Sequence, residues 1–319
     1  MDKPFEDALA DLRISGSALL HKCYAPPWAI DLPEQAQIKS LLKLDPSKRI
    51  VPFHLVRKGE FNLQLEQEAP VRVRAHEVII CPGGGAHRMA FGSPARSVTL
   101  EQIISGLEPA LGAPDAPDTT ELLCGVFMLQ AAPLNPLWSA LPPLLTVVTA
   151  GAQADPMLTL AADMLTLELS RPSRGAGFTA SRLLEIFCAE AIRAYWRRGG
   201  NHPPGWFCGL NDPRIAQALG LIHAKAGAPW SVAKLADAVA LSPSRFAARF
   251  RETMNEAVMT YISRWRMNLA CRMLVDSDMS IAEIAHRLGY EAAPSFARAF
   301  KAELGHTPGY WRTIRKTHH

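Results

Sequence analysis

Two segments late in the chain each place arginine side chains beside a pair of phenylalanines. Phe246 and Phe250 are four residues apart, and Phe296 and Phe300 repeat that spacing fifty positions later. Residues four apart lie on one face of a helix, so each pair predicts one buried face and one exposed face. An exposed arginine can donate two hydrogen bonds to guanine in the DNA major groove. The expected DNA contacts are Ser244, Arg245, Ala248 and Arg249 in the first helix and Ala293, Ser295 and Arg298 in the second.

A short helical pattern and a tight turn precede each of these two helices. Residues 235–250 and 284–300 therefore indicate two helix-turn-helix motifs. A connecting helix over about 256–275 would be about 30 Å long, close to one turn of B-DNA at about 34 Å. This length predicts that one chain can place both motifs in successive major grooves. Arg264 and Arg266 on the connecting helix are expected to contact DNA phosphates.

Helix start signals recur through the same part of the chain. Asp212 and Ser242 each precede a proline, which is the pattern of an N-cap followed by the first helical residue. Ser231 and Ser280 are expected to cap two further helices. Residues 206–319 are therefore predicted to be entirely helical.

Charge is distributed unevenly along the sequence. Residues 212–319 hold 15 Lys and Arg against 9 Asp and Glu, whereas residues 1–211 hold 19 against 21. The net charge of +4 therefore comes from the part that carries the two motifs, as a surface facing DNA phosphates requires.

The whole sequence, with 319 residues, suggests about two domains. It holds no apolar run long enough to cross a bilayer, and it starts without the pattern of a signal peptide. We therefore expect a soluble cytoplasmic protein that has no contact with membranes. The six cysteines form no CxxC pair, and most are expected to be buried and reduced.

The first half of the chain has a different pattern. Between about 50 and 148, short apolar runs alternate with Gly and Pro, and Phe61, Leu63 and Leu65 alternate with polar residues. This period of two predicts half-buried strands in a β-sandwich or barrel. Residues 156–170 and 179–198 predict amphipathic helices. Apolar residues at helical spacing predict a packing face, made of Met157, Leu160, Met164 and Leu167. This face would contact either a second sensor domain or the DNA-binding domain, and the apolar stripe suggests a homodimer through these helices.

The helical part resembles the AraC/XylS family of bacterial transcription regulators. The resemblance lies in the stretch that starts at Ile281-Ala-Glu-Ile-Ala, in the run Ser295-Phe-Ala-Arg-Ala-Phe-Lys, and in the ending Gly305-His-Thr-Pro-Gly-Tyr-Trp-Arg312. It implies a sequence-specific regulator that binds double-stranded DNA, activates transcription and contacts RNA polymerase. Relatives often carry Gln or Arg where this chain has Ala247, Ala248, Ala293 and Pro294, so direct base contacts are expected to be fewer here.

The first half resembles cupin-like sensor domains. Pro82-Gly-Gly-Gly-Ala-His87 is similar to the second cupin motif, His54 falls near the first, and Cys23-Tyr-Ala-Pro-Pro-Trp28 and Cys124-Gly125 resemble a subgroup of sensors. The resemblance implies that Cys23, His54, His87 and Cys124 converge. Such a set would suit zinc or copper(I), or its thiols could react with oxidants or electrophiles. Each of the four also has an ordinary structural interpretation, as a buried residue of the core. A small organic molecule would then be the effector.

These observations together predict an α+β protein in three parts. Residues 1–150 would form a cupin-like sensor domain, 151–205 a helical dimerisation and linker segment, and 206–319 an AraC-type tandem helix-turn-helix domain. The expected function is signal-controlled transcription regulation, with no catalytic residue. The only cofactor expected is a zinc or copper ion in the sensor domain. The alternative is a metal-dependent cupin enzyme with a helical appendage, and the incomplete metal motif disfavours it.

Overall fold

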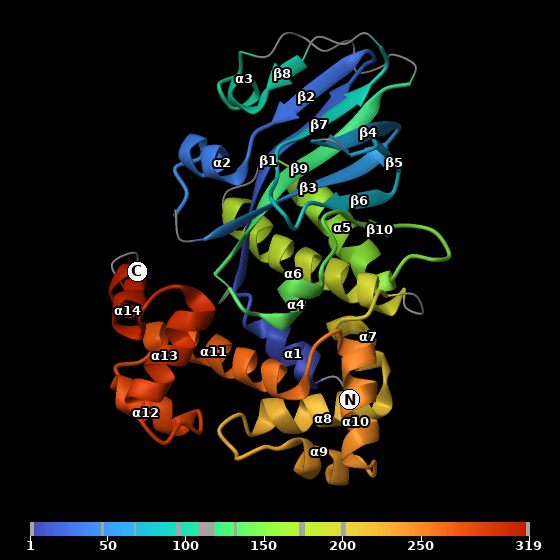
Figure 1. The fold of residues 1–319 in the computed structure, drawn as a ribbon. Coiled ribbons are helices and arrows are strands. Elements are labelled where there is room, and N and C mark those ends of the chain that lie inside the picture. Colours follow the sequence, from blue (N-terminus) through green and yellow to red (C-terminus); the bar gives the residue numbers. More distant parts are fainter. Residues whose placement is uncertain are drawn as a thin grey trace. The chain divides into compact units, whose positions relative to one another are not determined.

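The computed structural model describes most of the chain and divides it into two compact units (Figure 1). The sandwich unit comprises the described parts of 14–130 and 141–199, and the helical unit comprises the described parts of 1–13, 131–140 and 200–319. The described residues are 3–45, 48–66, 68–93, 97–107, 118–130, 133–171, 176–198 and 202–316.

The sandwich unit contains two five-stranded sheets. The first has, in spatial order, β1 (Ile14–Tyr24), β9 (Thr120–Leu129), β3 (Arg49–Lys58), β6 (Glu77–Ile80) and β10 (Leu145–Val148). The second has β5 (Val71–Arg74), β4 (Glu60–Leu65), β7 (His87–Phe91), β2 (Trp28–Leu32) and β8 (Ser97–Thr99). All of these pairs are antiparallel except β2 with β8. Two short helices, α2 (Gln35–Leu41) and α3 (Leu100–Ile104), follow β2 and β8.

One apolar core lies between the two sheets. It is built from inward-facing side chains of both, including Trp28 and Phe61 from the second sheet and Val56 and Leu122 from the first. The alternation predicted for β4 is confirmed, because Phe61 and Leu63 are buried while the residues between and after them are exposed. The α+β prediction is confirmed as well, with the first half forming a sandwich.

Two long helices, α5 (Pro156–Leu169) and α6 (Ala176–Arg197), pack against each other, and α6 covers the outer face of the first sheet (Figure 1). Phe53 and Phe127 stack with ring centroids 4.5 Å apart, and Phe187 of α6 packs edge-on against Phe53 at 5.8 Å. Because Phe53 faces α6, the next residue of β3, His54, faces the interior of the sandwich.

The helix α5 has two apolar faces. Leu158, Ala161, Ala162 and Leu165 are buried, but a second apolar stripe is about half exposed. The exposed fractions of that stripe are 52% for Met157, 53% for Leu160, 47% for Met164 and 51% for Leu167. The four residues of this stripe are therefore not those that α5 packs against the rest of the unit.

The part of the helical unit from residue 206 to 316 is built from helices, as the sequence predicts. Its elements are α7 (Trp206–Asn211), α8 (Pro213–Ala224), α9 (Val232–Ala238), α10 (Pro243–Met254), α11 (Val258–Asp276), α12 (Ile281–Arg287), α13 (Ala293–Leu304) and α14 (Pro308–Lys316). The four predicted caps are confirmed, because the side chains of Asp212, Ser231, Ser242 and Ser280 each accept a backbone N–H at a helix start.

Two short helices far away in the sequence also belong to this unit, namely α1 (Lys3–Ala10) and α4 (Pro136–Ala140). Asn135 donates to the Ala8 carbonyl oxygen at 2.8 Å, which ties the two together. The buried carboxylate of Asp11 pairs with Arg272 on α11 and accepts from Asn268 at 3.3 Å. These contacts hold α1 to the helix that connects the two motifs.

Candidate DNA-binding surface and sensor site

The second helix of each motif buries its phenylalanines and exposes its polar face. Phe246 and Phe250 of α10, like Phe296 and Phe300 of α13, have no exposed surface. The pairs touch within each helix, with ring centroids 5.8 Å apart in both cases. Each pair therefore fixes which face of its helix is turned outward.

On α10 the predicted contacts Ser244, Arg245, Ala248 and Arg249 are all exposed. Arg249 forms an ion pair, because its Nε donates to a carboxylate oxygen of Asp212 at 2.7 Å, and the Ser244 hydroxyl lies 3.4 Å from that of Ser242. Asp212 also caps α8. Arg249 therefore ties α10 to α8 in addition to facing solvent.

On α13 the predicted contacts Ser295 and Arg298 are exposed and Ala293 is half-buried. Arg298 donates to the Ser295 hydroxyl at 3.3 Å. Such a long hydrogen bond between two exposed groups is weak, so it leaves the guanidinium available to another acceptor.

The two arginines of α11 lie in a different environment. Arg264 forms an ion pair with Glu256 at 2.5 Å. Arg266 donates through Nε to the Ala226 carbonyl oxygen and through Nη2 to that of Ala228, both at 2.8 Å. Both side chains are half-buried and engaged within the helical unit, whereas the sequence suggested phosphate contacts for them.

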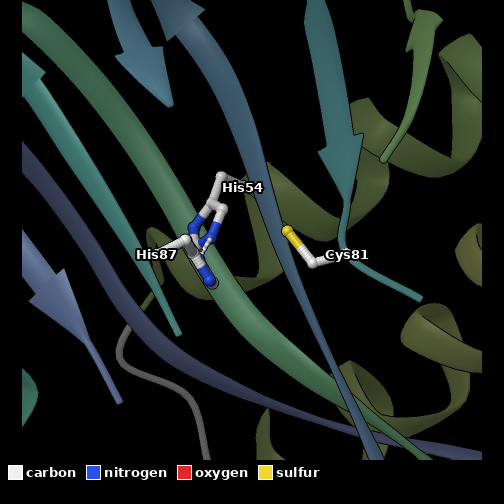
Figure 2. A group of neighbouring side chains, drawn as sticks. All are labelled: His54, Cys81 and His87. Carbon is white, nitrogen blue, oxygen red and sulfur yellow. Dashed lines mark hydrogen bonds between the residues drawn. The ribbon is translucent and has the colours of Figure 1, made fainter. Parts of the chain in front are cut away.

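Three polar side chains converge inside the sandwich unit (Figure 2). One nitrogen of His54, one of His87 and the Cys81 sulfur all lie within 4.8 Å of one another, and all three residues are buried. His54 comes from β3 in the first sheet, and His87 begins β7 in the second. Cys81 directly follows β6, and its N–H donates to the Pro52 carbonyl oxygen of β3 at 2.8 Å.

A glycine-rich turn connects Cys81 to His87. Gly84 donates to the Cys81 carbonyl oxygen at 3.0 Å and has a left-handed φ of 64°. A Cβ atom there would lie 2.9 Å from the Ile50 carbonyl oxygen, so both the conformation and the space favour glycine. The turn allows the chain to cross from one sheet to the other within six residues.

The hydrogen bonds of the two histidines define their protonation. His87 Nδ1 lies 2.9 Å from the Gly85 carbonyl oxygen, so this nitrogen carries a proton and donates it. Burial lowers the pKa of His87, and burial together with His87 lowers that of His54 well below its usual range. His87 is therefore neutral, and its Nε2 accepts a hydrogen bond from His54 Nε2 at 2.9 Å. His54 Nδ1 is buried with no hydrogen-bond partner among the described residues.

The structure brings together two of the four side chains expected at the sensor site. His54 and His87 meet. Cys124 is paired across the ladder with His54 and lies in the same core as Cys81, whose thiol adds to the effect of burial in raising the Cys124 pKa. Cys23 is exposed on β1, because its neighbour Tyr24 points into the core and successive strand residues face opposite ways.

The thiols near this site are not activated. Burial raises the pKa of Cys81 to about 12 and raises that of Cys124 as well. The pKa of Cys23 is also raised, by partial burial and by Glu121. Oxidants and electrophiles react with the thiolate, so these cysteines are poor targets for them. A metal ion, in contrast, can displace a thiol proton directly.

No helix in the described part of the chain combines the length and the apolar character needed to cross a lipid bilayer.

Comparison with known proteins identifies both units. A family model described as "Cupin" matches residues 3–197, and one described as "Helix-turn-helix domain" matches residues 235–314. A putative AraC-like transcription regulator of Streptomyces lividans is 28% identical over 265 residues, covering 83% of this chain and 87% of the relative. The HTH-type transcriptional regulator AlkR of Acinetobacter baylyi is 25% identical, covering 81% and 86%.

A third relative is the RCS-specific HTH-type transcriptional activator RclR of Escherichia coli, which is 23% identical and covers 82% of this chain and 84% of its own. These relatives are regulators, which removes the enzyme alternative. The chain belongs to the AraC-type DNA-binding transcription regulators that carry an N-terminal cupin domain.

Proposed function

We propose that this regulator responds to a soft metal ion bound by His54, Cys81 and His87, and that the bound ion changes its affinity for operator DNA. The observation that carries the proposal is the convergence of two imidazoles and a thiol in an otherwise apolar core. His87 offers the Nε2 lone pair, while its Nδ1 is oriented by a backbone carbonyl, as in metal-ligating histidines. His54 Nδ1 in this cluster is buried and has no hydrogen-bond partner among the described residues.

Charge favours a monovalent ion at this site. With the Cys81 thiol deprotonated, two neutral imidazoles and one thiolate give a neutral complex with Cu⁺ and a net positive one with Zn²⁺. The surrounding core is apolar, and leaving an uncompensated charge in such a core costs several kcal/mol. Thiolate and imidazole ligands suit copper(I), whereas structural zinc sites usually have four ligands. We therefore assign Cu⁺ as the signal and Zn²⁺ as its competitor.

The test measures operator affinity with and without metal. Operator DNA would be selected from a random library, and the affinity of the full chain would be measured after chelation and after addition of one equivalent of Cu⁺ (without oxygen) or of Zn²⁺. A change in affinity with Cu⁺ that is larger than the change with Zn²⁺ is expected. Unchanged affinity with both ions would refute metal control, and an organic effector would then be the better explanation.

Base reading is assigned to Arg245 of α10 and Arg298 of α13. Both are exposed on the faces opposite the buried phenylalanines, and neither has an ion pair among the described contacts. Arg249 would line the face of α10 as well. The shorter side chains of Ser244, Ala248, Ala293 and Ser295 on the same two faces would allow close approach to DNA. Deformation of the DNA would supply the remaining specificity.

Replacing Arg298 by alanine is expected to weaken operator binding by about 1–3 kcal/mol and to relax the preference at one base pair. Arg298→Lys is the matched control, because lysine keeps the charge and loses the planar fork. The lysine variant should lose the base preference while keeping the dependence of affinity on salt. If Arg298→Ala weakens all sequences equally, Arg298 contacts a phosphate.

A homodimer is proposed to form through the exposed stripe of α5. Met157, Leu160, Met164 and Leu167 are spaced by three, four and three residues, which is the a/d spacing of a coiled-coil seam. The exposure of all four supports a second copy of the chain as the partner, because one seam can pair with itself about a two-fold axis.

The paired substitution Leu160→Glu and Met164→Glu is expected to raise the dimer dissociation constant by at least about 100-fold, because unpaired carboxylates would be buried in the seam. Leu107→Glu changes another exposed leucine and serves as the control. Sedimentation equilibrium measures the result, and a wild-type monomer at micromolar concentration would contradict the dimer.

We also propose that the protein acts in the cytoplasm as an activator that contacts RNA polymerase. The name of the relative RclR, a transcriptional activator, supports this direction. Transcription in vitro from a promoter that carries the selected operator would decide it, with repression as the contrary outcome.

A further inference from the structure

The loop before the first helix-turn-helix motif meets the turn of the second motif at a close contact between two glycines. Gly227 lies in the loop between α8 and α9, and Gly289 lies in the turn between α12 and α13. A Cβ atom on Gly227 would lie 2.2 Å from the Arg287 carbonyl oxygen, and one on Gly289 would lie 2.4 Å from the Gly227 carbonyl oxygen. Backbone atoms cannot yield at such distances without moving their chain segments. A side chain at either position would therefore push the two segments apart.

Arg266 of the connecting helix α11 secures this contact. Its Nε and Nη2 donate to the carbonyl oxygens of Ala226 and Ala228, which flank Gly227, at 2.8 Å each. The same guanidinium lies 5.9 Å from the centre of the Tyr290 ring, in the turn of the second motif. The planar guanidinium of Arg266, on the connecting helix, therefore contacts both the loop before the first motif and the turn of the second.

Further contacts extend from this junction to both motifs. On one side, Lys234 of α9 donates to the Pro229 carbonyl oxygen at 2.9 Å, which ties the loop to the first motif. On the other side, the Tyr290 ring packs edge-on against Phe296 with centroids 5.5 Å apart. Phe296 is a buried residue of α13, the outward-facing helix of the second motif. The junction is therefore in direct contact with an element that presents side chains to DNA.

We propose that the junction of Gly227, Gly289 and Arg266 fixes the spacing and rotational phase of the two DNA half-sites that one chain reads. The helix α11 sets the distance between the motifs and packs against helices of both, and the junction adds a contact that links the loop before the first motif to the turn of the second. Adding one base pair moves a half-site by about 3.4 Å and rotates it by about 35°. If the junction is fixed, the two motifs cannot move with the displaced half-site. Binding to the altered spacing then costs free energy. Arg266 is thus a positioning residue that acts through the motifs and does not touch DNA.

Gly227→Ala is the most specific variant for testing this junction. Gly227 does not have a left-handed φ, whereas Gly289 has a φ of 80°. Alanine at 227 therefore disturbs the contact without straining its own backbone. Gly220→Ala is the matched control, because a Cβ atom there meets open space on α8. Arg266→Lys keeps the charge but cannot hold both carbonyl oxygens in a planar fork.

The experiment uses the full chain, the selected operator and two derivatives of it with one base pair inserted or deleted between the half-sites. The wild-type protein and Gly220→Ala are expected to lose at least about tenfold in affinity on either derivative, which corresponds to about 1.4 kcal/mol. Gly227→Ala and Arg266→Lys are expected to bind the native spacing more weakly and to distinguish the three spacings by less than about threefold. Thermal unfolding confirms that each variant is folded.

Three results would overturn the proposal. The first is a wild-type protein that tolerates both altered spacings. The second is an equal loss of affinity on all three DNAs for Gly227→Ala and Arg266→Lys, which would indicate a general effect on folding or on phosphate contacts. The third is wild-type behaviour of both variants. If Arg266→Lys alone fails to fold, Gly227→Ala decides between these outcomes.

Discussion

Replacing Cys81 by serine is expected to weaken Cu⁺ binding by more than about 100-fold. Loss of a group that only orients a metal ligand already costs about 10- to 100-fold in affinity, and Cys81 supplies the only thiol of the three-residue cluster. Serine nearly matches cysteine in size, so the apolar core around the site is preserved. A hydroxyl is a far poorer ligand for a soft ion than a thiolate. Competition against a chromogenic Cu⁺ chelator measures the affinity directly.

Two further variants show whether this loss reports a metal site. Cys188→Ser makes the same chemical change at a buried thiol of α6 outside the cluster, and it should bind Cu⁺ like the wild type. His54→Gln should lose affinity to a similar extent as Cys81→Ser, because it removes a second ligand. If Cys81→Ser and His54→Gln both keep wild-type affinity, the copper binds elsewhere and the proposed sensor is wrong.

Part of this site could be predicted from the sequence. His87 was identified by its place in a cupin-like motif, and His54 by its place near another. Cys81 is not among the predicted site residues, because it ends the apolar run Val78-Ile-Ile-Cys, which is typical of a buried strand. The alternation of side-chain direction along a strand is the signal that indicates an inward-facing Cys81. Ile79 and Cys81 belong to the core between the sheets, so Cys81 had to point the same way as its inward-facing neighbour.

The same alternation of side-chain direction along a strand explains why Cys23 lies outside the cluster. Tyr24 is buried in the core between the sheets, so Cys23 faces outward. A sequence resemblance placed Cys23 beside the histidines without regard to the direction of its side chain. Which residue of a strand faces inward depends on register with its neighbours, and a single sequence does not fix that register.

The helical unit was predictable where the signals are local. N-caps, prolines at helix starts and the spacing of the phenylalanines all act within one or two turns, and each gave the correct helix. The role of Arg266 depends instead on carbonyl groups about forty residues earlier in the chain. The packing of α1 against α11 depends on an even longer separation. Such contacts are set by tertiary packing, which local patterns do not encode.

The stability of the helical unit is expected to fall steeply below pH 6.5 because of His223. This histidine of α8 stacks on Trp265 of α11 with ring centroids 3.8 Å apart, and its Nε2 lies 2.7 Å from the Tyr261 hydroxyl. Burial lowers its pKa to about 3. In the unfolded chain the pKa of a histidine is about 6.5. The unfolded chain therefore binds a proton at pH values where His223 of the folded unit is still neutral. Stability is therefore complete above pH 6.5 and is lost as the pH falls from there toward 3.

The size of this effect follows from about 1.4 kcal/mol per pH unit. Between pH 7.5 and pH 5, His223 should remove about 2 kcal/mol from the free energy of unfolding, measured by urea denaturation. His223→Phe should reduce the pH dependence by that amount, because phenylalanine has no proton to gain. Tyr261→Phe should keep the wild-type dependence, because burial and not the hydroxyl lowers the pKa. Equal slopes for His223→Phe and the wild type would mean that His223 is accessible to protons in the folded unit. The packing of α8 against α11 would then be looser than the stacked rings require.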